Sequence, residues 1–449
     1  MTDPTPGSDT PGSDAPTRKP VRVPWFWRIL VLAVVVRVAW AVLVPVVPVS
    51  DPGAYDTMAR NLAAGHGYSL EPFREDANPD DFTPTAYWAV GAPAVYAAGF
   101  AVFGDTYAPV VAVNLIANVA TIAFVMLLAA RWLTPRHATA AGLCLALWPG
   151  QIGFTTLLAS ELLFAFGLLA AVYAWHRLEA GRGFVRVPVV GVLLGLTCLV
   201  RPTALLVPVL LVIVAVAQNK EGLRGVIKPT LHAGLAAVVM IAVVLPWSFR
   251  NQRALGEFVL VSANSGANFW MGNHPGTDGV YAVLPPETAA MSEVRRDAYL
   301  KDLALDYIKQ DPAAFVQRTL IKAVKLHDRE TIGVVWNAGG LEQRFGGDGF
   351  VGPLKLASTA YWWVMLGSGL GGMLLLWVRG GTVRGFFVML FHPAVVYWGY
   401  FLTVHAIVVV QDRYHWPSVP FIAMLAALPI VAVCDLVRTR KAQAMGGAA

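Results

Sequence analysis

Ten apolar runs constrain the fold of this chain more than any other feature. They lie at residues 25–47, 107–130, 138–153, 157–175, 187–200, 203–217, 230–249, 354–377, 386–410 and 417–436. An apolar helix of about 20 residues spans a bilayer, where the backbone must satisfy its own hydrogen bonds. Several runs are short or contain proline, so the sequence predicts an all-α polytopic membrane protein with about ten (roughly 8–13) transmembrane helices.

Composition and charge agree with this class. The chain is 56% hydrophobic and 14% charged, against about 25% charged residues in soluble domains. Its net charge of +6 does not indicate nucleic-acid binding, because basic residues retained in the cytoplasm give the same excess. Basic groups recur on alternate loops and favour cytoplasmic N- and C-termini. These loops carry Arg131, Arg136, Arg177, Arg186, Arg224, Lys228, Arg379, Arg384, Arg438, Arg440 and Lys441.

The same pattern divides the chain into five parts. Residues 1–22 repeat TPGSD and predict a disordered cytoplasmic tail. The first apolar run resembles a signal-peptide core, but no small-residue cleavage site follows it, so we expect an uncleaved first helix. The parts that follow are an N-terminal membrane module (23–249) with a first extracytoplasmic loop (49–107), an extracytoplasmic loop domain (250–353), C-terminal membrane helices (354–437) and a cytoplasmic tail (438–449).

Both extracytoplasmic loops show amphipathic helical patterns. Tyr55, Met58, Ala59 and Leu62 repeat at helical spacing before Gly65, which predicts a short helix lying on the membrane. In the second loop, residues 287–310 have a helical sequence pattern. Asp311 and Pro312 then mark the start of a helix over 312–327 that is suited to the membrane interface. Its polar positions include Arg318, Lys322 and Lys325.

Polar residues gather at the extracytoplasmic helix ends. They include Asp51, Asp56, Glu161, Arg201, Arg250, His274, Asp278, Arg413 and His415. A charge at the bilayer centre costs at least about 2.5–3.5 kcal/mol, and so many charges on one side indicate chemistry there. The chain has no P-loop and no glycine-rich dinucleotide motif, so a soluble nucleotide-linked substrate is not indicated.

Two carboxylates have competing interpretations. Asp51 fits a helix N-cap with Pro52 at the first helical position, and it equally fits a general base or metal ligand. Glu161 opens an apolar helix, where the helix dipole stabilises it, and it would make a second carboxylate beside Asp51. Asp56 is expected to be a solvated partner of Arg60 at i,i+4 spacing.

Three arginines also have two interpretations. Arg201, Arg250 and Arg413 follow apolar runs and can snorkel to lipid headgroups, or their guanidinium forks can bind phosphate. Asp412 is an expected partner of Arg413. Tyr87 and Trp88 are expected in an interfacial aromatic belt.

Several segments resemble a known family when they are taken in order. They are DPGAYDTMARNLAAGHGYS, TPTAYWAVGAPAVYAAGFAVFG, ASELLF, VRPTALLVP, PWSFRNQRALGEFVLVSANSGANFWMGNHPGTDGVY and RYHWPSVPF, over residues 49–425. The series resembles bacterial GT-C glycosyltransferases of the lipid-A aminoarabinose transferase and protein O-mannosyltransferase type.

The resemblance implies a polyprenyl-phosphate sugar donor, used on the outer face of the bacterial cytoplasmic membrane. The acceptor, whether lipid, glycan or protein, stays unknown. Asp51 matches the essential aspartate of the family, and Ser160-Glu161 matches its later Ser-Glu pair. We therefore expect inverting transfer with Asp51 as base. Arg250, Arg413 and Arg201 would bind the phosphate, and Glu161 is a candidate ligand for a divalent metal ion. Tyr55, His66, Asn273, His274 and Tyr414 are further candidate substrate contacts.

Two other functions stay open at this stage. A lipid or glycan flippase would place ionisable groups near the bilayer midplane, often within inverted repeats, and the sequence shows no convincing repeat. A non-catalytic membrane protein of envelope assembly is compatible with Asp51 acting only as a cap.

Overall fold

The computed structural model describes residues 22–74, 78–178, 183–219 and 221–446. Within these ranges the regular structure is helical, apart from one isolated bridge between Ser69 and Pro84. The all-α polytopic class is therefore confirmed. The predicted disordered tail lies outside the described residues except for Arg22, as do residues 447–449 at the other end.

Five helices in the described part of the chain are long and apolar enough to cross a membrane. They are α1 (Phe26–Leu43), α4 (Ala108–Trp132), α10 (Arg224–Leu255), α16 (Val351–Arg379) and α19 (Val419–Gly446), the last preceded by the turn η5 (Trp416–Ser418). Two bent pairs raise the number to seven. One is α6 (Pro149–Gly153) and η2 (Phe154–Thr156) with α7 (Glu161–Leu178), bent by 114°, and the other is α17 (Thr382–Leu390) with α18 (Pro393–Ile407), bent by 65°.

Shorter apolar helices complete the membrane body. They are α3 (Gly91–Phe103), α5 (Pro135–Ala146), α8 (Gly183–Val200) and α9 (Val207–Ala217), with η3 (Pro202–Ala204) between the last two. Every predicted apolar run contains helix. Fewer helices than ten are long enough to span a membrane unaided, because prolines and breaks divide several runs.

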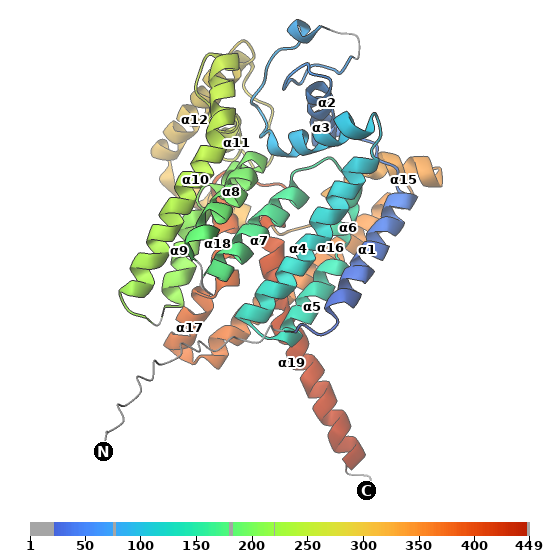
Figure 1. Ribbon diagram of the computed structural model, residues 1–449, viewed down its shortest axis with the longest axis vertical. Helices are drawn as coiled ribbons and strands as arrows, with labels where there is room; N and C mark the ends of the chain where they lie inside the picture. The colour runs from blue at the N-terminus through green and yellow to red at the C-terminus, as the bar shows by residue number, and fades with distance from the viewer. Residues whose placement is uncertain (1–21, 75–77, 179–182, 220, 447–449) are drawn as a thin grey trace, which may run out of the picture.

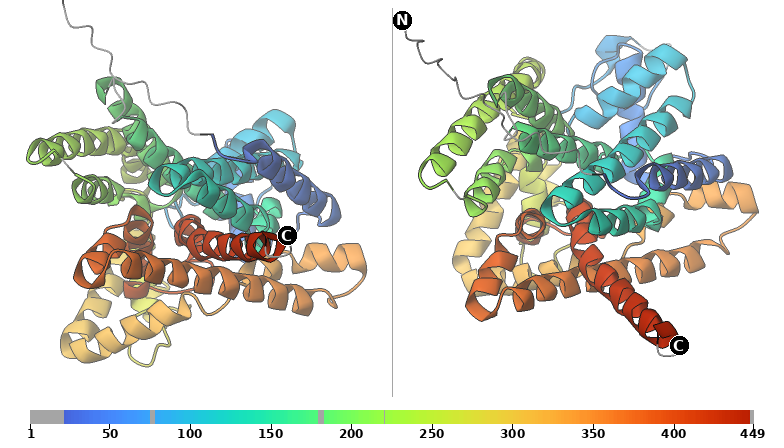
Figure 2. Two further views of the ribbon diagram at one scale, coloured as in Figure 1. Left: turned by 90° about the horizontal axis from the view of Figure 1, so that it is seen from below. Right: turned by 60° about the horizontal axis from the view of Figure 1, so that its bottom comes forward.

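The helices pack as a bundle around an apolar core. Seen from below, α19 lies between α5 and α16 (Figure 2). On the other side α8 packs against α7 and α10. A Cβ added at Gly191 or Gly195 of α8 would lie 2.5–2.6 Å from the side chains of Val239 and Val243 of α10. These two glycines therefore permit the close approach of the helices, as small residues do in membrane bundles.

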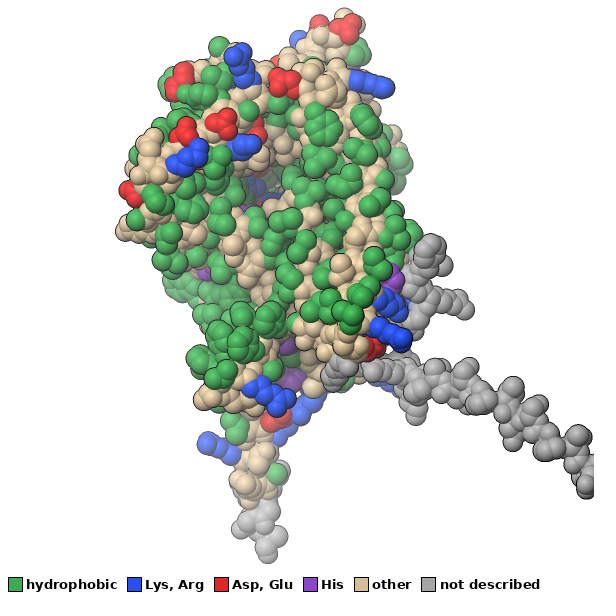
Figure 3. Space-filling model, turned by 90° about the vertical axis from the view of Figure 1, so that its left-hand side faces the viewer, with side chains coloured by type: hydrophobic (Ala, Val, Ile, Leu, Met, Phe, Trp, Pro, Cys, Tyr) green, Lys and Arg blue, Asp and Glu red, His purple; other side chains and the backbone are tan. Residues whose placement is uncertain are grey.

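The outer surface of the bundle is apolar between two more polar ends. On α10, Leu231 and Val238 are 67% and 66% exposed. Figure 3 shows a broad hydrophobic band, with charged side chains above and below it. Such a continuous apolar surface is typical of contact with lipid rather than with water. The first residues of α1 and the end of α19 lie at one end of the bundle (Figure 1).

The opposite end carries the helices of the two predicted extracytoplasmic loops (Figure 1). The first loop holds α2 (Ser50–Ala63) and η1 (Pro79–Asp81). The second holds α11 (Ser265–Met271), η4 (Pro286–Thr288), α12 (Glu293–Gln310), α13 (Pro312–Lys325), α14 (Ile332–Val335) and α15 (Ala338–Phe345).

Capping fixes two of these helices. The Asp311 side chain accepts the N–H of Ala314 at 2.9 Å, which confirms the predicted start of α13. The predicted helix over 287–310 starts later, at Glu293, because Ser292 caps it there. Lys322 was expected on the polar face of α13, but it is buried. Its ammonium donates to the backbone oxygens of Gly272, Ile407 and Val408 and to Asn273 Oδ1.

Candidate active site

The start of α2 presents Asp51. The helix begins at Ser50, Val49 is its N-cap residue, and no side chain caps it. The predicted capping role of Asp51 is therefore wrong: Asp51 lies in the first turn, and its carboxylate is bonded elsewhere. The helix ends at Ala63, before Gly65 at φ +81°, as the sequence predicts.

Asp51 belongs to a four-residue cluster of alternating charge. Arg413 donates from Nη2 to Asp51 Oδ2 at 2.5 Å and from Nη1 to Glu161 Oε1 at 3.4 Å. Arg201 pairs with the same Glu161 oxygen and donates from Nε to Ser160 Oγ at 2.8 Å. The Glu161 side chain is fully buried, whereas that of Asp51 is 26% exposed. Asp51 is therefore the carboxylate of this cluster that a substrate can reach.

Breaks in the helices bring these groups together. Glu161 is the first residue of α7, directly after the sharp bend that follows η2. Arg201 follows the last residue of α8, and Arg413 lies in the loop between α18 and α19. Burial lowers the pKa of Arg413, but the charges of Asp51 and Glu161 outweigh it, so that this pKa lies above its usual value. Arg413 therefore stays charged, as a buried ion pair requires.

A cavity of about 860 Å³ opens beside Asp51. A cavity of this volume accommodates a small molecule or one sugar with its phosphate. Residues from the first loop, the second loop and the segment before α19 line it. Their polar and aromatic members are Ser50, Asp51, Tyr87, Trp88, Tyr281, Glu293, Arg296, Lys325, Asp328, Arg329, Thr331, Trp336, Gln411, Asp412 and Arg413.

Three of the basic residues that line this cavity were not predicted as site residues. Arg329 is 60% exposed and lies 3.3 Å from Asp328. Lys325 donates to the Asp278 carbonyl at 2.8 Å, and the Arg296 guanidinium lies 6.0 Å from the Tyr87 ring centre. Their sequence signal is weak because exposed basic residues are common in loops. Only the fold shows that they share a cavity with Asp51.

Arg250, the first predicted phosphate ligand, is not among the residues that line the cavity. It donates to the carbonyls of Thr85 and Tyr68, at 2.8 and 3.2 Å. Its guanidinium also lies 4.8 Å from the Trp247 ring centre. In the structure Arg250 therefore holds the first loop against α10.

The candidate substrate contacts fall into two groups. Tyr55 and Tyr414 lie next to the cluster. The Tyr55 ring is 6.5 Å from that of Trp88, and the Tyr414 ring centre is 5.2 Å from the Arg413 guanidinium. Burial raises the pKa of Tyr55 to about 12, so its hydroxyl stays protonated at neutral pH.

None of the five candidate contacts lines the cavity, and the other three have structural partners away from the cluster. His66 stacks on Phe82 at 4.5 Å. His274 stacks on Trp270 at 4.3 Å. Asn273 accepts a hydrogen bond from Lys322. Stacking and buried hydrogen bonds of this kind stabilise the loop domain.

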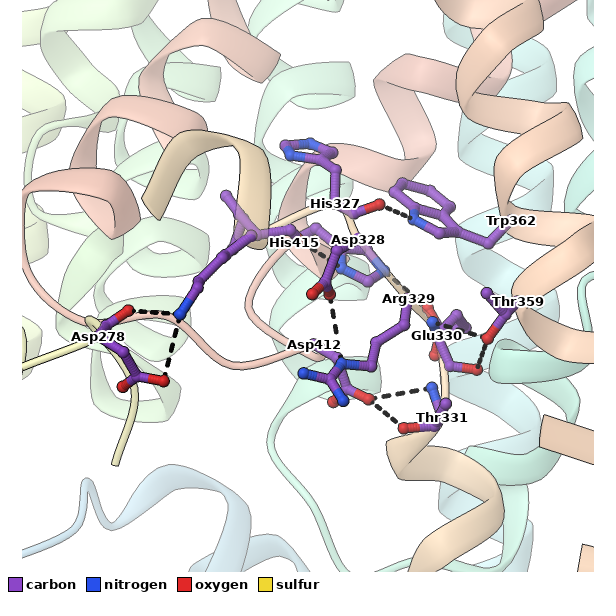
Figure 4. A network of polar contacts seen from close by, with 12 residues as sticks. Asp278, His327, Asp328, Arg329, Glu330, Thr331, Thr359, Trp362, Asp412 and His415 are labelled. Atoms are coloured by element: carbon purple, nitrogen blue, oxygen red, sulfur yellow. Dashed lines mark hydrogen bonds and ion pairs between the residues drawn. The ribbon is translucent and has the colours of Figure 1, made fainter. Parts of the chain in front are cut away.

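Other pairings differ from expectation. Asp412 does not bond Arg413; it accepts from the hydroxyl and N–H of Thr331, at 2.6 and 3.0 Å (Figure 4). Tyr87 and Trp88 line the cavity, and their place in an interfacial belt stays a prediction. The predicted Asp56–Arg60 pair is confirmed at 2.9 Å, but Asp56 is not solvated as expected, since its side chain is only 16% exposed and also accepts from the Tyr107 hydroxyl.

Glu161 is not part of a preformed divalent-metal site among the described residues. Within the described ranges, no group of three or more His, Cys, Asp or Glu side chains is placed to hold a metal. Zn²⁺ and Ca²⁺ usually take several such ligands, whereas Mg²⁺ can be held by one or two carboxylates together with substrate phosphates. Glu161 Oε2 has no hydrogen-bond partner in the structure, but Oε1 already contacts two guanidinium groups. Arginines supply the positive charge in this cluster.

Comparison with known proteins gives one family match. The model of the family described as dolichyl-phosphate-mannose-protein mannosyltransferase matches residues 88–247. This segment includes Glu161 and Arg201 but neither Asp51 nor Arg413. No curated protein matches the chain.

Solved structures match over nearly the whole chain. The crystal structure of the Archaeoglobus fulgidus oligosaccharyltransferase with Zn and sulfate has a TM-score of 0.54 at 16% identity, and covers 94% of this chain and 51% of its own. AglB from the same organism, with an inhibitory peptide and a dolichol-phosphate, has a TM-score of 0.55 at 14% identity. This match covers 93% of this chain and 51% of the AglB chain. ArnT from Cupriavidus metallidurans bound to undecaprenyl phosphate has a TM-score of 0.45 at 16% identity. This match covers 92% of this chain and 79% of the ArnT chain.

The chain spans about half the length of the archaeal structures that it matches. Similarity at this level of identity shows the fold. The predicted resemblance to GT-C glycosyltransferases is confirmed, by the family model in sequence and by the archaeal structures in fold.

Proposed function

We propose that this GT-C-fold chain is a glycosyltransferase that moves a sugar from a polyprenyl-phosphate donor to an acceptor hydroxyl. The observation that carries the proposal is Asp51, a partly exposed carboxylate held by Arg413 at the edge of a large cavity that also presents basic side chains. The family match supports the reaction class. Dolichol-phosphate in the AglB structure supports the donor class.

Asp51 acts as the general base of an inverting transfer. It takes the proton of the acceptor hydroxyl while that oxygen attacks the anomeric carbon. The new carbon–oxygen bond forms on the face opposite the phosphate, and the bond between the anomeric carbon and the phosphate oxygen breaks. A positioned base contributes about 10²–10⁴-fold to the rate. The contact with Arg413 fixes the direction of the carboxylate, which leaves Oδ1 for the acceptor.

The basic residues Arg296, Lys325 and Arg329 meet the leaving phosphate. Arg413 and Arg201 already pair with carboxylates, so their forks are engaged before a substrate arrives. Arg329 and Lys325 pair only with the exposed carboxylates of Asp328 and Asp278, which a phosphate can displace more easily than a buried partner. Arg296 lines the same cavity. Donors aimed at the developing phosphate charge lower the barrier most where water is excluded. This assignment replaces the phosphate role that the sequence suggested for Arg250.

The reaction takes place on the extracytoplasmic side of a bacterial cytoplasmic membrane. The loops whose residues line the cavity lie at the end of the bundle opposite the first residues of α1 and the end of α19 (Figure 1). The basic groups of Arg136, Arg379 and Arg384 belong to the end near the termini, which the positive-inside rule assigns to the cytoplasm. The loops 49–107 and 250–353 together build the cavity over the membrane body.

The experiment that tests this function uses the full chain in lipid nanodiscs. Purified protein is incubated with radiolabelled polyprenyl-phosphate mannose, glucose or arabinose and with membranes of the source cell as the acceptor. The expected result is label in a product and release of polyprenyl phosphate. Movement of intact donor across proteoliposomes without release would indicate a flippase. Binding without either event would indicate a non-catalytic protein.

A further inference from the structure

Two loops that line the cavity are joined side by side. Glu330 Oε2 lies 2.6 Å from His415 Nε2, and Thr331 donates to Asp412 at 2.6 Å (Figure 4). Glu330 and Thr331 are neighbours in one loop, and Asp412 and His415 lie three residues apart in the other. We call these two contacts the loop clasp. One loop carries Asp328 and Arg329 to the cavity, and the other carries Arg413.

The partners of His415 restrict where its protons lie. Nδ1 is 3.0 Å from the carbonyl oxygen of Leu326, which only accepts hydrogen bonds, so Nδ1 carries a proton. Nε2 then has two options. It either donates to an ionised Glu330, as an imidazolium, or accepts the O–H of a protonated Glu330.

Burial favours the neutral option. Neither side chain is exposed by more than 1%, and the His415 ring stacks on Trp362 at 4.1 Å. Glu330 Oε1 has no hydrogen-bond partner in the structure. A Cβ at Gly150 of α6 would lie 2.7 Å from this oxygen, so α6 closes that side. A buried carboxylate with one unbonded oxygen is costly, whereas a carboxylic acid needs fewer partners.

Burial shifts the pKa values of the two groups in opposite directions. Burial raises the pKa of Glu330, and the negative charges of Asp412 and Glu161 raise it further, while the nearby Trp416 indole acts in the opposite direction without cancelling the rise. Burial lowers the pKa of His415, although Asp412 and Asp328 oppose this effect. His327, whose ring centre lies 6.0 Å from that of His415, is the other titratable neighbour, and burial lowers its pKa as well.

We propose that Glu330 and His415 share one proton as a neutral acid–imidazole pair, and that this pair positions Arg413, and through it Asp51, for the reaction. Both are positioning residues, since neither lines the cavity. Arg413 precedes His415 by two residues in the same loop, so a displacement of the clasp moves the guanidinium that holds Asp51. The protonation part stands on the structure alone, and the catalytic part rests on the proposed function.

The protonation is tested without activity. Infrared spectra of the purified protein at neutral pH should show a protonated-carboxyl C=O band that Glu330→Gln removes and Asp51→Asn leaves in place. Nitrogen NMR of labelled histidine should show His415 as a neutral imidazole with its proton on Nδ1. If the spectrum of Glu330→Gln kept the whole carboxyl band, or if His415 gave an imidazolium signal, the proposal of a neutral pair would be overturned.

The positioning role is tested by comparing Glu330→Gln with Glu330→Ala. An amide N–H can donate to His415 Nε2, so Glu330→Gln should keep kcat within about fivefold of the native value. Glu330→Ala removes the contact, and a displacement of about 1 Å at the reacting groups costs about 100-fold in kcat. Its KM for the donor should change less than kcat, because Arg296 on α12 is outside the two loops that the clasp joins.

Thermal unfolding in detergent identifies variants that are folded. If a folded Glu330→Gln lost as much kcat as Glu330→Ala, the positioning role of a neutral pair would be overturned. If Glu330→Ala does not fold, the Gln variant and the spectra still decide the proposal. Absence of transfer by the native protein would overturn the proposed function and leave the spectroscopic result standing.

Discussion

The Arg413 guanidinium lies 2.5 Å from the Asp51 carboxylate and so joins the first turn of α2 to the loop before α19, 362 residues later. The same guanidinium contacts Glu161, which a second arginine, Arg201, also pairs with. A carboxylate at the edge of the cavity is therefore fixed by a buried cation. This arrangement gives Asp51 a defined direction without a role in capping its helix.

Replacing Arg413 should damage both stability and transfer. Arg413→Ala leaves Asp51 and the fully buried Glu161 without one cation, and breaking a buried pair costs about 3–5 kcal/mol. Arg413→Lys keeps the charge but cannot bridge both carboxylates, so it should stay folded and lose most transfer. Thermal unfolding and initial rates measure the two effects. Native rates in Arg413→Lys would show that bridging is not needed.

Replacing the basic residues of the cavity should weaken donor binding. Arg296→Gln and Arg329→Gln remove donors for the phosphate, so KM for the polyprenyl-phosphate donor should rise about tenfold or more in each. Arg295→Gln is the matched control, since Arg295 precedes Arg296 on α12 but does not line the cavity. An equal rise of KM in the control variant would count against the assignment.

Stability should fall in acid because of His327. Trp398 donates to His327 Nε2 at 3.2 Å, and burial, followed by the charge of His415, lowers the His327 pKa to about 4. Between about pH 6.5 and pH 4 the unfolded chain binds a proton that the folded protein does not. The free energy of unfolding therefore decreases as pH falls through this window and levels off below it.

His327→Gln tests this pH dependence, because its amide oxygen can still accept from Trp398. Thermal unfolding midpoints measured from pH 7.5 to pH 4, about one pH step at a time, should fall less steeply in the variant than in the native protein. Parallel curves would mean that His327 does not contribute. His415 adds little to this slope, because the proton that it lacks in the folded protein is carried by its partner Glu330.

Removing divalent metal should not stop transfer. Glu161 contacts two arginines, and the described residues form no group of three metal-binding side chains. Dialysis against EDTA should therefore leave the rate within about twofold of the untreated protein, as expected when protein cations meet the developing charge. Loss of activity that added Mg²⁺, Mn²⁺ or Zn²⁺ restores would contradict this conclusion.

The sequence was sufficient for the class of fold and for part of the site. Apolar runs locate the membrane helices because burial in lipid requires a long apolar helix whatever its neighbours are. Local signals were equally reliable at Asp311, which caps α13, and at Asp56, which pairs with Arg60 one turn away. The motif resemblance selected Asp51 and Glu161, the charge pattern at the helix ends selected Arg201 and Arg413, and the structure brings these four side chains together.

The errors concern partners that are distant in sequence. Asp51 satisfied every local rule for a cap, yet its carboxylate bonds Arg413. Arg250 has the same local pattern as Arg201, but it packs on the first loop instead of joining the cluster. Arg296 and Arg329 carried no motif at all. Helix ends and loops can pack in many ways, so these assignments depend on the complete fold.

Transfer by Asp51→Asn measures the central claim most directly. The variant removes the base and keeps the shape of the side chain, while Asp56→Asn, five residues along α2 and paired with Arg60, is the matched control. With a donor that the native protein uses, Asp51→Asn should lose about 10²–10⁴-fold in rate and remain folded, and Asp56→Asn should keep its rate. Native rates in a folded Asp51→Asn would contradict the account.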